Sequence, residues 1–466
     1  IKVYGWELPE ETEPLRQNIQ AIADGHRDIL LLTSAHQIVN MMRMAEQMGI
    51  TNQLRSGLRT TAIASIGPTT SQMLTECDLR ADLEPAHPKM GHLEVESAKQ
   101  AAQIVASKKL ISETDSVIQA SLAFADKATG ESETHPSHNS LFLRACRGEP
   151  TERTPIWLMR QAGRYMAEYR EVRAKQSFLE LCGNPSLCSE VMCTAVDRLG
   201  VDAAIIFSDL LPLLQPLGFD LEIVAGDGPV IHNPIRSDAD LCRLRRVEDP
   251  GALGFVYETV RQTRADLPAE TPLIGFAGSP FTLASYAIEG GGSRVYTNTK
   301  RLMYQSVGGS SSAWTELMNT LTEAITVYLN HQIAAGAQCV QLFDSWAGCL
   351  SPAEYSEFVL PWMNQIIAGI APGVPVINFA TGNPELLPLL RGDSRTVVGV
   401  DWRISLPTAW DRIGRDKSVQ GNLDPAVLLA EPDVIRSRTA SLLESVAGRR
   451  GHIFNVGHGV LKETPV

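Results

Sequence analysis

The sequence predicts an α/β protein in two parts, a (β/α)8 barrel over residues 139–466 and a smaller lobe with a parallel sheet over residues 1–108. Two observations predict this fold. Strand-like and helix-like segments alternate through the first 108 residues, and eight apolar, strand-like runs recur after residue 139, separated by helical or loop segments. Eight such units fit a closed barrel better than a doubly wound open sheet, which does not usually need eight evenly recurring strands.

In the first part, short apolar runs bounded by turn residues predict strands, and segments with one apolar face predict helices. The expected strands are Asp28–Thr33, Thr60–Ser65 and Arg80–Glu84, and the expected helices are Gln37–Gln47, Thr69–Glu76 and His92–Ser107. Because strands and helices alternate, the strands should be parallel, with the helices packed on the sheet.

Residues 109–138 are expected to form an interdomain linker. Their last part, Thr129–Asn139, is rich in Ser, Thr and His and contains a proline. A segment of this composition cannot bury enough apolar surface to fold alone. The sequence therefore predicts a boundary here between the lobe and the barrel.

The strand-like runs of the second part mostly end in polar or small residues. The runs are Pro155–Arg160, Ala203–Asp209, Pro272–Gly278, Cys339–Ser345, Pro375–Thr381, Thr396–Trp402, Ser418–Asp424 and His452–His458. In a barrel the carboxyl ends of the strands converge on one mouth, where active sites are built. A single polar strand end can simply begin a loop. Seven ends together favour a site at this mouth: Arg160, Asp209, Gly278, Ser345, Asp401, Asp424 and His458.

The composition excludes several classes of protein. Hydrophobic residues make up 44% and charged residues 20% of the chain, as in ordinary globular proteins. No apolar run reaches the roughly 18 residues that span a bilayer. The formal net charge of −12 argues against binding to nucleic acid or to an anionic membrane surface. An anionic substrate would therefore need a local basic cluster.

The use of cysteine and histidine indicates a cytoplasmic protein without a metal. The eight cysteines form no CxxC and the ten histidines form no HExxH, so reduced thiols are expected rather than disulfides or zinc. The chain opens at Ile1 with no signal sequence and ends at Val466, soon after the last strand. We therefore expect a fragment whose barrel lacks its last helix.

The densest basic segment is Arg153–Phe178, which holds six basic and two acidic residues. Arg160 and Arg164 flank a Gln-Ala-Gly turn at the end of the first barrel strand. Guanidinium groups there can clamp carboxylates through two parallel hydrogen bonds, which lysine does less well. A solvated helix face explains Arg170 and Lys175, but it is a weak explanation for Arg160, which directly follows an apolar run.

Three further residues at or near strand ends are candidates for binding. Asp209 lies between apolar neighbours, so it either pairs with an arginine or waits for a cationic or N–H-rich ligand. The glycines of Gly275–Ser293 form neither phosphate-binding fingerprint and favour close approach of a large flat ligand, with Tyr286 supplying a hydroxyl. His458 stands between two glycines, and it is either a satisfied structural histidine or a binding residue.

Together these segments closely resemble the uroporphyrinogen decarboxylase family. The motifs occur in family order: MRQAGRYMAEYR (159–170), FSDLL (207–211), GFAGSPFTL (275–283), EGGGS (289–293), LFDSWAG (342–348), QGNLDP (420–425) and FNVGHG (454–459). The resemblance implies a (β/α)8 TIM barrel that forms a homodimer. It also implies conversion of uroporphyrinogen III to coproporphyrinogen III, by loss of four acetate carboxyl groups as carbon dioxide, without cofactor or metal.

The resemblance also implies the site. The catalytic residues would be Asp209, Arg160, Tyr286 and His458. The substrate-binding residues would be these four with Gln161, Ala162, Gly163, Arg164, Arg173, Phe178 and Ser345. The substrate of the family carries eight carboxylates, which agrees with an arginine cluster on an acidic chain. One central carboxylate, Asp209, can accept hydrogen bonds from the pyrrole N–H groups and stabilise a ring that has been protonated on carbon.

Residues 1–108 resemble a different family, uroporphyrinogen-III synthase, which cyclises hydroxymethylbilane. The similar segments are VYGWELPE (3–10), TSAHQ (33–37), ASIGPTTSQML (64–74) and LEPAHPKMGHL (83–93). Tyr4 and the Thr69-Thr70 pair match family positions near the substrate. Only the C-terminal half of that family is matched, so the resemblance implies a partial three-layer α/β lobe with an incomplete cleft.

The sequence thus predicts a cytoplasmic fusion enzyme of porphyrin biosynthesis, with a partial synthase lobe before a decarboxylase barrel. One alternative is a corrinoid-linked methyltransferase, which shares the barrel but would be expected to hold zinc through a His/Cys set at strand ends. The RQAGR motif and the lack of a paired His-x-Cys argue against it. The other alternative is that the N-terminal segment acts only as an interaction module.

Overall fold

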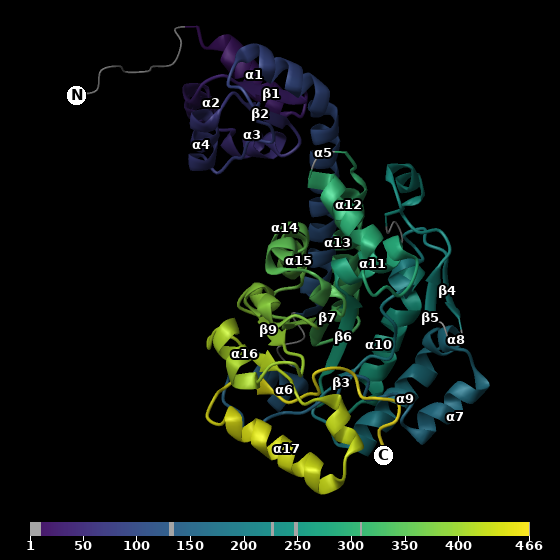
Figure 1. Ribbon diagram of the computed structural model, residues 1–466. Coiled ribbons are helices and arrows are strands. Elements are labelled where there is room, and N and C mark those ends of the chain that lie inside the picture. Colours follow the sequence, from purple (N-terminus) through teal and green to yellow (C-terminus); the bar gives the residue numbers. More distant parts are fainter. Residues whose placement is uncertain (1–10, 130–134, 225–227, 247–249, 308–309, 466) are drawn as a thin grey trace. The chain divides into compact units, whose positions relative to one another are not determined.

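The computed structural model describes residues 11–129, 135–224, 228–246, 250–307 and 310–465. The chain divides into two compact units, Ile1–Ser116 and Val117–Val466 (Figure 1). In the described residues, no helix has both the length and the apolar composition needed to cross a membrane.

The first unit is a small parallel sheet between helices. Strands β1 (Ile29–Leu32) and β2 (Ala62–Ser65) are parallel, and the third expected strand is reduced to a bridge between Leu83 and Ala64. The helices are α1 (Glu13–Ala23), α2 (Ala35–Met48), α3 (Thr51–Leu58) and α4 (Pro68–Glu76). The helices α1 and α3 are not among those the sequence predicts.

The two faces of this sheet are covered by different helices. Ile63 of β2 packs in one apolar cluster with residues of α1 to α4, whereas its neighbour Ala64 packs with Leu93 at the start of α5 (Met90–Thr129). Successive strand residues point to opposite faces, so the sheet lies between two helical layers. This confirms the predicted three-layer α/β arrangement.

Helix α5 occupies most of the residues that the sequence predicts to be a linker. The sequence predicts a helix that stops at Ser107, but α5 runs on to Thr129, through most of residues 109–138. Beyond it, residues 130–134 lie outside the described part of the chain. The end of α5 packs on the second unit through residues that share one face of the helix. Ala125 is part of the apolar core, Leu122 packs against it, and Ile118 is buried near Gly369. Ser121, on the same face, accepts a hydrogen bond from Asn330. The apolar residues of this face lie directly before the polar stretch that follows Thr129, so the composition of residues 109–138 as a whole does not reveal the apolar face.

The second unit is a barrel of parallel strands, as predicted. Seven strands pair in the order β11-β10-β9-β8-β7-β6-β3. Their bounds are β3 Ala204–Ile205, β6 Leu273–Gly278, β7 Cys339–Asp344, β8 Val376–Ala380, β9 Thr396–Gly399, β10 Val419–Gln420 and β11 His452–Ile453. A separate antiparallel hairpin is formed by β4 (Leu221–Val224) and β5 (Gly228–Ile231).

The first predicted barrel strand, Pro155–Arg160, is present only as a short bridging segment. Ile156 forms a parallel bridge with Phe454, just after β11, and on its other side its carbonyl accepts a hydrogen bond from the Asp202 N–H at 2.7 Å. The segment therefore joins the two edges of the seven-stranded sheet and completes the barrel. The N–H of Ile156 donates to the Asp202 carboxylate at 2.8 Å. At this residue a hydrogen bond to a side chain thus replaces a backbone hydrogen bond between strands.

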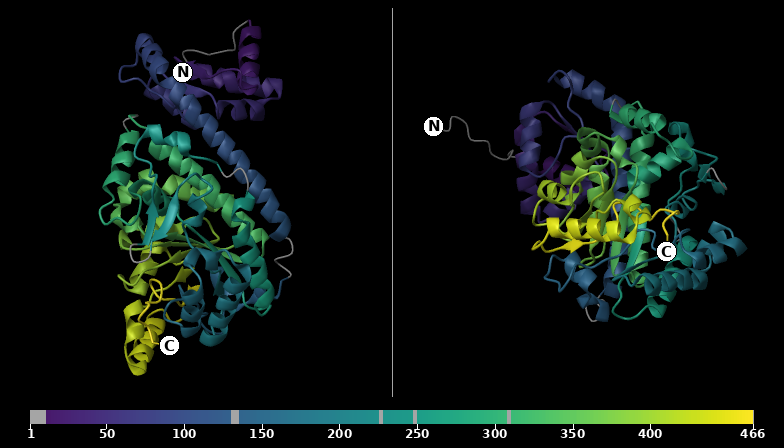
Figure 2. Two further views of the ribbon diagram at one scale, coloured as in Figure 1. Left: turned by 90° about the vertical axis from the view of Figure 1, so that its right-hand side faces the viewer. Right: turned by 60° about the horizontal axis from the view of Figure 1, so that its bottom comes forward.

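Helices surround these strands (Figure 2). They are α6 Leu141–Cys146, α7 Ala167–Lys175, α8 Phe178–Cys182, α9 Pro185–Leu199, α10 Gly254–Asp266, α11 Pro280–Glu289, α12 Thr297–Val307, α13 Ala313–Ala334, α14 Pro352–Phe358, α15 Leu360–Gly369, α16 Leu406–Ile413 and α17 Pro432–Ser445. After β11, residues 454–465 contain no helix. The helix α6, which lies before the first strand segment in sequence, packs against β11.

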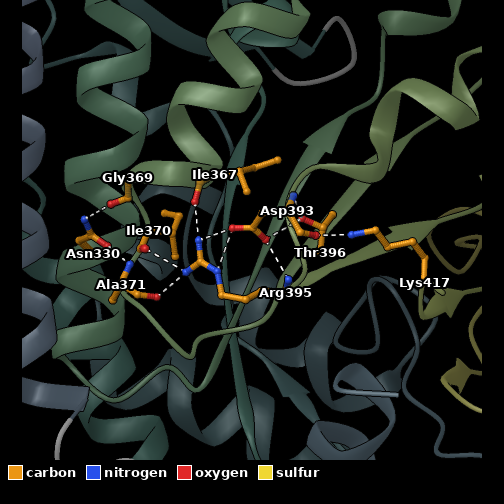
Figure 3. Close-up of polar contacts among 9 residues, drawn as sticks. All are labelled: Asn330, Ile367, Gly369, Ile370, Ala371, Asp393, Arg395, Thr396 and Lys417. Carbon is orange, nitrogen blue, oxygen red and sulfur yellow. Dashed lines mark hydrogen bonds and ion pairs between the residues drawn. The ribbon is translucent and has the colours of Figure 1, made fainter. Parts of the chain in front are cut away.

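The end of the barrel opposite the mouth is held by Arg395, directly before β9 (Figure 3). Its guanidinium donates to the carbonyls of Ile367, Ile370 and Ala371 at the end of α15 and pairs with Asp393 at 2.6 Å. The last carbonyls of a helix have few partners within the helix itself, so one arginine here supplies donors to three carbonyls at and just beyond the end of α15. The contacts join α15 to the sheet away from the site described next.

Candidate functional site

The predicted site residues lie at one edge of the barrel. The seven strands are parallel, so their carboxyl ends share that edge. Asp209 follows β3, Ser345 follows β7 and His458 follows β11, while Tyr286 lies on α11, the helix after β6. These residues, three of them predicted from strand ends, therefore lie on or after elements that meet at the same edge of the sheet.

Arg160 is exposed and adopts a left-handed backbone conformation, with φ of 64°. Its loop is bonded to the last strand segment by the Val460 N–H, which donates to the Met159 carbonyl at 2.9 Å. A methyl group on Gly459 would lie 2.5 Å from Arg160 Cδ, so glycine is needed for the arginine stem to cross here. The second glycine of the predicted Gly-His-Gly motif thus makes room for Arg160.

Asp209 is a partly exposed carboxylate whose pKa is raised above its ordinary value. Burial is the largest cause, and hydrogen bonds from the backbone of Leu211 and Leu210 and the charge of Arg160 oppose it. Its Oδ1 accepts from the Leu211 N–H at 2.9 Å. Loss of solvation outweighs these partners, so the site favours binding of a further donor or cation to this carboxylate.

Tyr286 lies in the same electrostatic environment. Its ring packs on Trp346, with 3.8 Å between ring centroids. Burial raises the pKa of its hydroxyl to about 12, with a further rise from the charge of Asp209 and an opposite effect from Arg160. The phenol is therefore neutral and acts as a hydrogen-bonding group.

His458 is held as a neutral imidazole at neutral pH. Burial lowers its pKa most, and the positive charges of Arg160 and Arg403 lower it further, while Asp401 acts in the opposite direction. Arg160 thus affects the ionisation of Asp209, Tyr286 and His458 alike. The structure therefore places Arg160 within electrostatic reach of the other three residues, and Asp209 within reach of Tyr286.

Arg173 and Phe178 flank this group from α7 and α8. The Arg173 guanidinium lies 5.8 Å from the centre of the Phe178 ring. That ring meets Phe207, two residues before Asp209, edge to face at 6.1 Å. The two residues therefore form an aromatic and cationic wall beside the Asp209 segment.

Gln161 is one of the predicted substrate-binding residues, but it does not lie at the surface of the barrel mouth. Its side chain is fully buried, donates to the Ala203 carbonyl at 3.3 Å and accepts from the Leu158 N–H at 3.4 Å. These bonds attach the 158–161 turn to the segment before β3. Gln161 supports the Arg160 loop from inside.

The other predicted residues differ in exposure. Ala162 and Gly163 are half-buried, and Arg164 is exposed, with its carbonyl accepting from Arg170 at 2.9 Å. Ser345 is partly exposed, and its carbonyl accepts from Thr381 Oγ1 at 2.9 Å. Ala162, Gly163, Arg164 and Ser345 thus all have some exposed surface.

Two residues at this edge were not among the predicted site residues. Asp344 ends β7 and is fully buried, and its Oδ1 accepts from Thr282 Oγ1 at 2.8 Å. Burial raises its pKa to about 7, against the opposing effect of Thr282. Arg403, after β9, pairs with Asp401 at 2.6 Å. A carboxylate at the end of an apolar run is the sequence signal that points to Asp344.

In the described ranges, no three or more Cys, His, Asp or Glu side chains are grouped so that they could hold a metal ion. All eight cysteines are free, four of them buried.

The comparisons with known proteins agree with the motifs. A family profile described as "Uroporphyrinogen decarboxylase (URO-D)" matches residues 137–466, and one described as "Uroporphyrinogen-III synthase HemD" matches residues 1–94. A uroporphyrinogen decarboxylase from Sorangium cellulosum is 52% identical over 326 residues, covering 70% of this chain and 92% of the relative. One from Roseiflexus sp. is 48% identical over 334 residues, covering 70% of this chain and 95% of the relative.

Among solved structures, a methyltransferase from Methanosarcina mazei has a similar fold. Its TM-score is 0.57 at 20% identity, over 70% of this chain and 95% of that chain. At this identity the similarity concerns the fold alone. It does not favour the methyltransferase alternative over the decarboxylase motifs.

Proposed function

Because the chain belongs to the uroporphyrinogen decarboxylase family, we propose that its barrel removes the four acetate carboxyl groups of uroporphyrinogen III to give coproporphyrinogen III in porphyrin biosynthesis. The observation that carries the proposal is Asp209, a partly exposed carboxylate at the barrel mouth whose pKa is raised by burial, within electrostatic reach of Arg160 and Tyr286. A macrocycle with four inward N–H groups is a ligand that such a carboxylate would hold.

Asp209 would act on charge that develops during the reaction. Protonation of a pyrrole carbon makes the ring cationic, and the electrons of the bond to the departing carboxylate then flow into that ring as carbon dioxide leaves. The exocyclic methylene that results takes up a proton to become the methyl group, and the ring carbon loses its added proton, which restores the pyrrole. An anion placed against the ring stabilises this cation where it forms. The raised pKa of Asp209 supports this role, because a poorly solvated carboxylate gains much from a new partner.

The basic and polar residues around Asp209 would hold the peripheral carboxylates and fix the ring. Arg160 and Arg164 offer forked donors to carboxylates. Tyr286 and Ser345 supply hydroxyl groups, and neutral His458 supplies a ring nitrogen. For Gln161, Ala162 and Gly163 the role would be to shape the loop that carries the arginines. Arg173 and Phe178 would bound the site on the α7–α8 side.

The decarboxylase is tested by incubating the full chain anaerobically with uroporphyrinogen III and measuring carbon dioxide release and the porphyrin products after oxidation. Stepwise loss of four carboxyl groups supports the proposal. Absence of product from a folded chain refutes it.

For the first unit we propose a partial synthase lobe ahead of the decarboxylase domain. The profile match to residues 1–94 supports this. Of the family positions near substrate, Thr69 is exposed and Thr70 is buried, and Tyr4 lies outside the described residues. Incubating the chain with hydroxymethylbilane distinguishes the two alternatives: cyclisation to uroporphyrinogen III indicates a synthase, and its absence an interaction module.

We further propose that the protein is cytoplasmic and dimerises through the barrel domain. Eight free thiols are in keeping with a reducing compartment. Sedimentation equilibrium of the full chain and of variants in its barrel surface tests the dimer. Cell fractionation tests the location.

A further inference from the structure

Arg403 lies beside the proposed site and is held by a buried carboxylate. Asp401, only 5% exposed, follows β9. Its Oδ1 accepts from the Arg403 backbone N–H at 2.9 Å, and its Oδ2 accepts from Arg403 Nη1 at 2.6 Å and from the Gly382 N–H at 2.7 Å. Both the backbone and the guanidinium of Arg403 are therefore fixed by one acid.

An aromatic ring restrains the guanidinium further. Arg403 Cζ lies 3.9 Å from the centre of the Trp402 ring, and that ring meets the His458 imidazole edge to face at 6.0 Å. The Trp402 backbone is itself in close contact with Gly457, where a methyl group would lie 2.4 Å from the Trp402 nitrogen. Arg403 is thus attached to the segment that carries His458, and its charge lowers the pKa of that histidine.

Part of the guanidinium remains available. The Arg403 side chain is 45% exposed. In the described part of the chain, its hydrogen bonds to protein acceptors involve only the backbone N–H and Nη1. Nε and Nη2 can therefore donate a planar pair of hydrogen bonds to an incoming carboxylate. Restraint of the arginine in advance lowers the entropic cost of that binding.

We infer that Arg403 binds one peripheral carboxylate of the substrate. The inference rests on the proposed function, because it supplies the polycarboxylate. Such a carboxylate belongs either to an acetate, which the reaction removes, or to a propionate, which the product keeps. Asp401 would be the positioning residue, and Trp402 the surface on which the guanidinium lies.

The test compares Arg403→Gln and Arg403→Lys with the wild-type chain. We expect Arg403→Gln to raise KM for uroporphyrinogen III by about 10-fold or more, as loss of a charged hydrogen-bonded pair does, with a smaller change in kcat. Arg403→Lys keeps a charge that can pair with Asp401 but lacks the fork, so its KM should stay raised. Arg415→Gln, at an exposed arginine on the surface, is the matched control and should leave KM unchanged.

Binding of coproporphyrinogen, which carries only propionates, identifies the carboxylate. Weaker product binding by Arg403→Gln indicates a propionate, and unchanged product binding with a raised KM indicates an acetate. If both variants melt at lower temperature but keep the wild-type KM and product affinity, the Asp401–Arg403 pair is purely structural and the inference is wrong. If the wild-type chain itself releases no carbon dioxide, the proposed function fails first, and this inference with it.

Discussion

Arg160 connects the charged groups of the barrel mouth. It affects the pKa of Asp209, Tyr286 and His458, and its stem crosses Gly459 where no side chain fits. Substrate carboxylates bound there would compete with Asp209 for the same positive charge. The geometry of this guanidinium should therefore matter more for turnover than for folding.

We expect Arg160→Lys to lower turnover more than it lowers the melting temperature, because lysine keeps the charge but loses the planar fork that positions a carboxylate. Steady-state kinetics and a thermal melt of the same preparation check this. Arg436→Lys, at an exposed arginine on α17, is the control. Kinetics equal to wild type would remove Arg160 from the site.

Asp209→Asn keeps the size of the side chain and replaces an anion by a neutral amide. Its Oδ1 can still accept from Leu211, so folding should be retained. Loss of the counter-charge to a cationic ring should reduce turnover on the order of 10²–10³. An unstable variant with normal activity per folded molecule would instead indicate a structural salt bridge with Arg160.

Asp344 should make stability depend on pH. Its pKa is about 7 in the folded protein against an ordinary 3.8 because it is buried, and Tyr296, Cys349 and Tyr355 around it are uncharged at neutral pH. Between about pH 4 and 7 the folded state keeps a proton that the unfolded state releases. This group therefore makes the free energy of unfolding fall as pH rises through that range and level off above it.

Asp344→Asn should remove that contribution and still accept from Thr282. Relative to wild type, the variant should be more stable at pH 8 than at pH 5. Urea unfolding at both values checks this, and an equal difference at the two pH values would contradict the assigned ionisation.

At the scale of elements, α5 belongs to both units. Ile118 is 3% exposed, and a methyl group on Gly369 would lie 2.7 Å from its Cγ2. Ser121 accepts a hydrogen bond from Asn330 of α13 at 3.0 Å. Asn330 in turn donates to the Gly369 carbonyl at 2.9 Å and accepts from the Ala371 N–H (Figure 3). The second half of the helix is thus part of the barrel's outer layer.

Ile118→Ala should lower the free energy of unfolding of the barrel unit by about 2–5 kcal/mol, the range for a buried isoleucine truncated to alanine. Gln119→Ala, at the exposed neighbour, should have little effect. Equal urea midpoints for the two variants would show that α5 does not stabilise the barrel. Activity per folded molecule should be unchanged in both.

At the scale of the whole molecule, the first unit should be dispensable for decarboxylation. Relatives that are decarboxylases are matched over 92% and 95% of their length by the barrel part of this chain. A chain that begins at Val117 should keep the kcat/KM of the full protein, whereas one that begins at His135 lacks the α5 contacts and should melt at lower temperature. A large loss of kcat/KM in the first of these would mean that the lobe contributes to the decarboxylase.

Much of the fold follows from local pattern. Runs such as Cys339–Ser345 and Pro375–Thr381 are apolar, short and bounded by polar residues, and they coincide with β7 and β8 within two residues. Pro155–Arg160 shows the same pattern, yet it is only a bridge, because the Asp202 side chain takes a backbone hydrogen bond. Where side chains compete for backbone groups, periodicity alone does not define a strand.

The sequence by itself determined the family, the two-part organisation and the strand ends near Arg160, Asp209 and His458, because apolar periodicity and motif order are local properties. Only the tertiary structure decided which of the predicted site residues are exposed at the barrel mouth and which are buried. It buried Gln161 as a loop support, extended α5 through the expected linker and joined Arg403 to the segment of His458. The physical reason is that burial and pKa depend on neighbours distant in sequence, which packing brings together and which spacing along the chain does not encode.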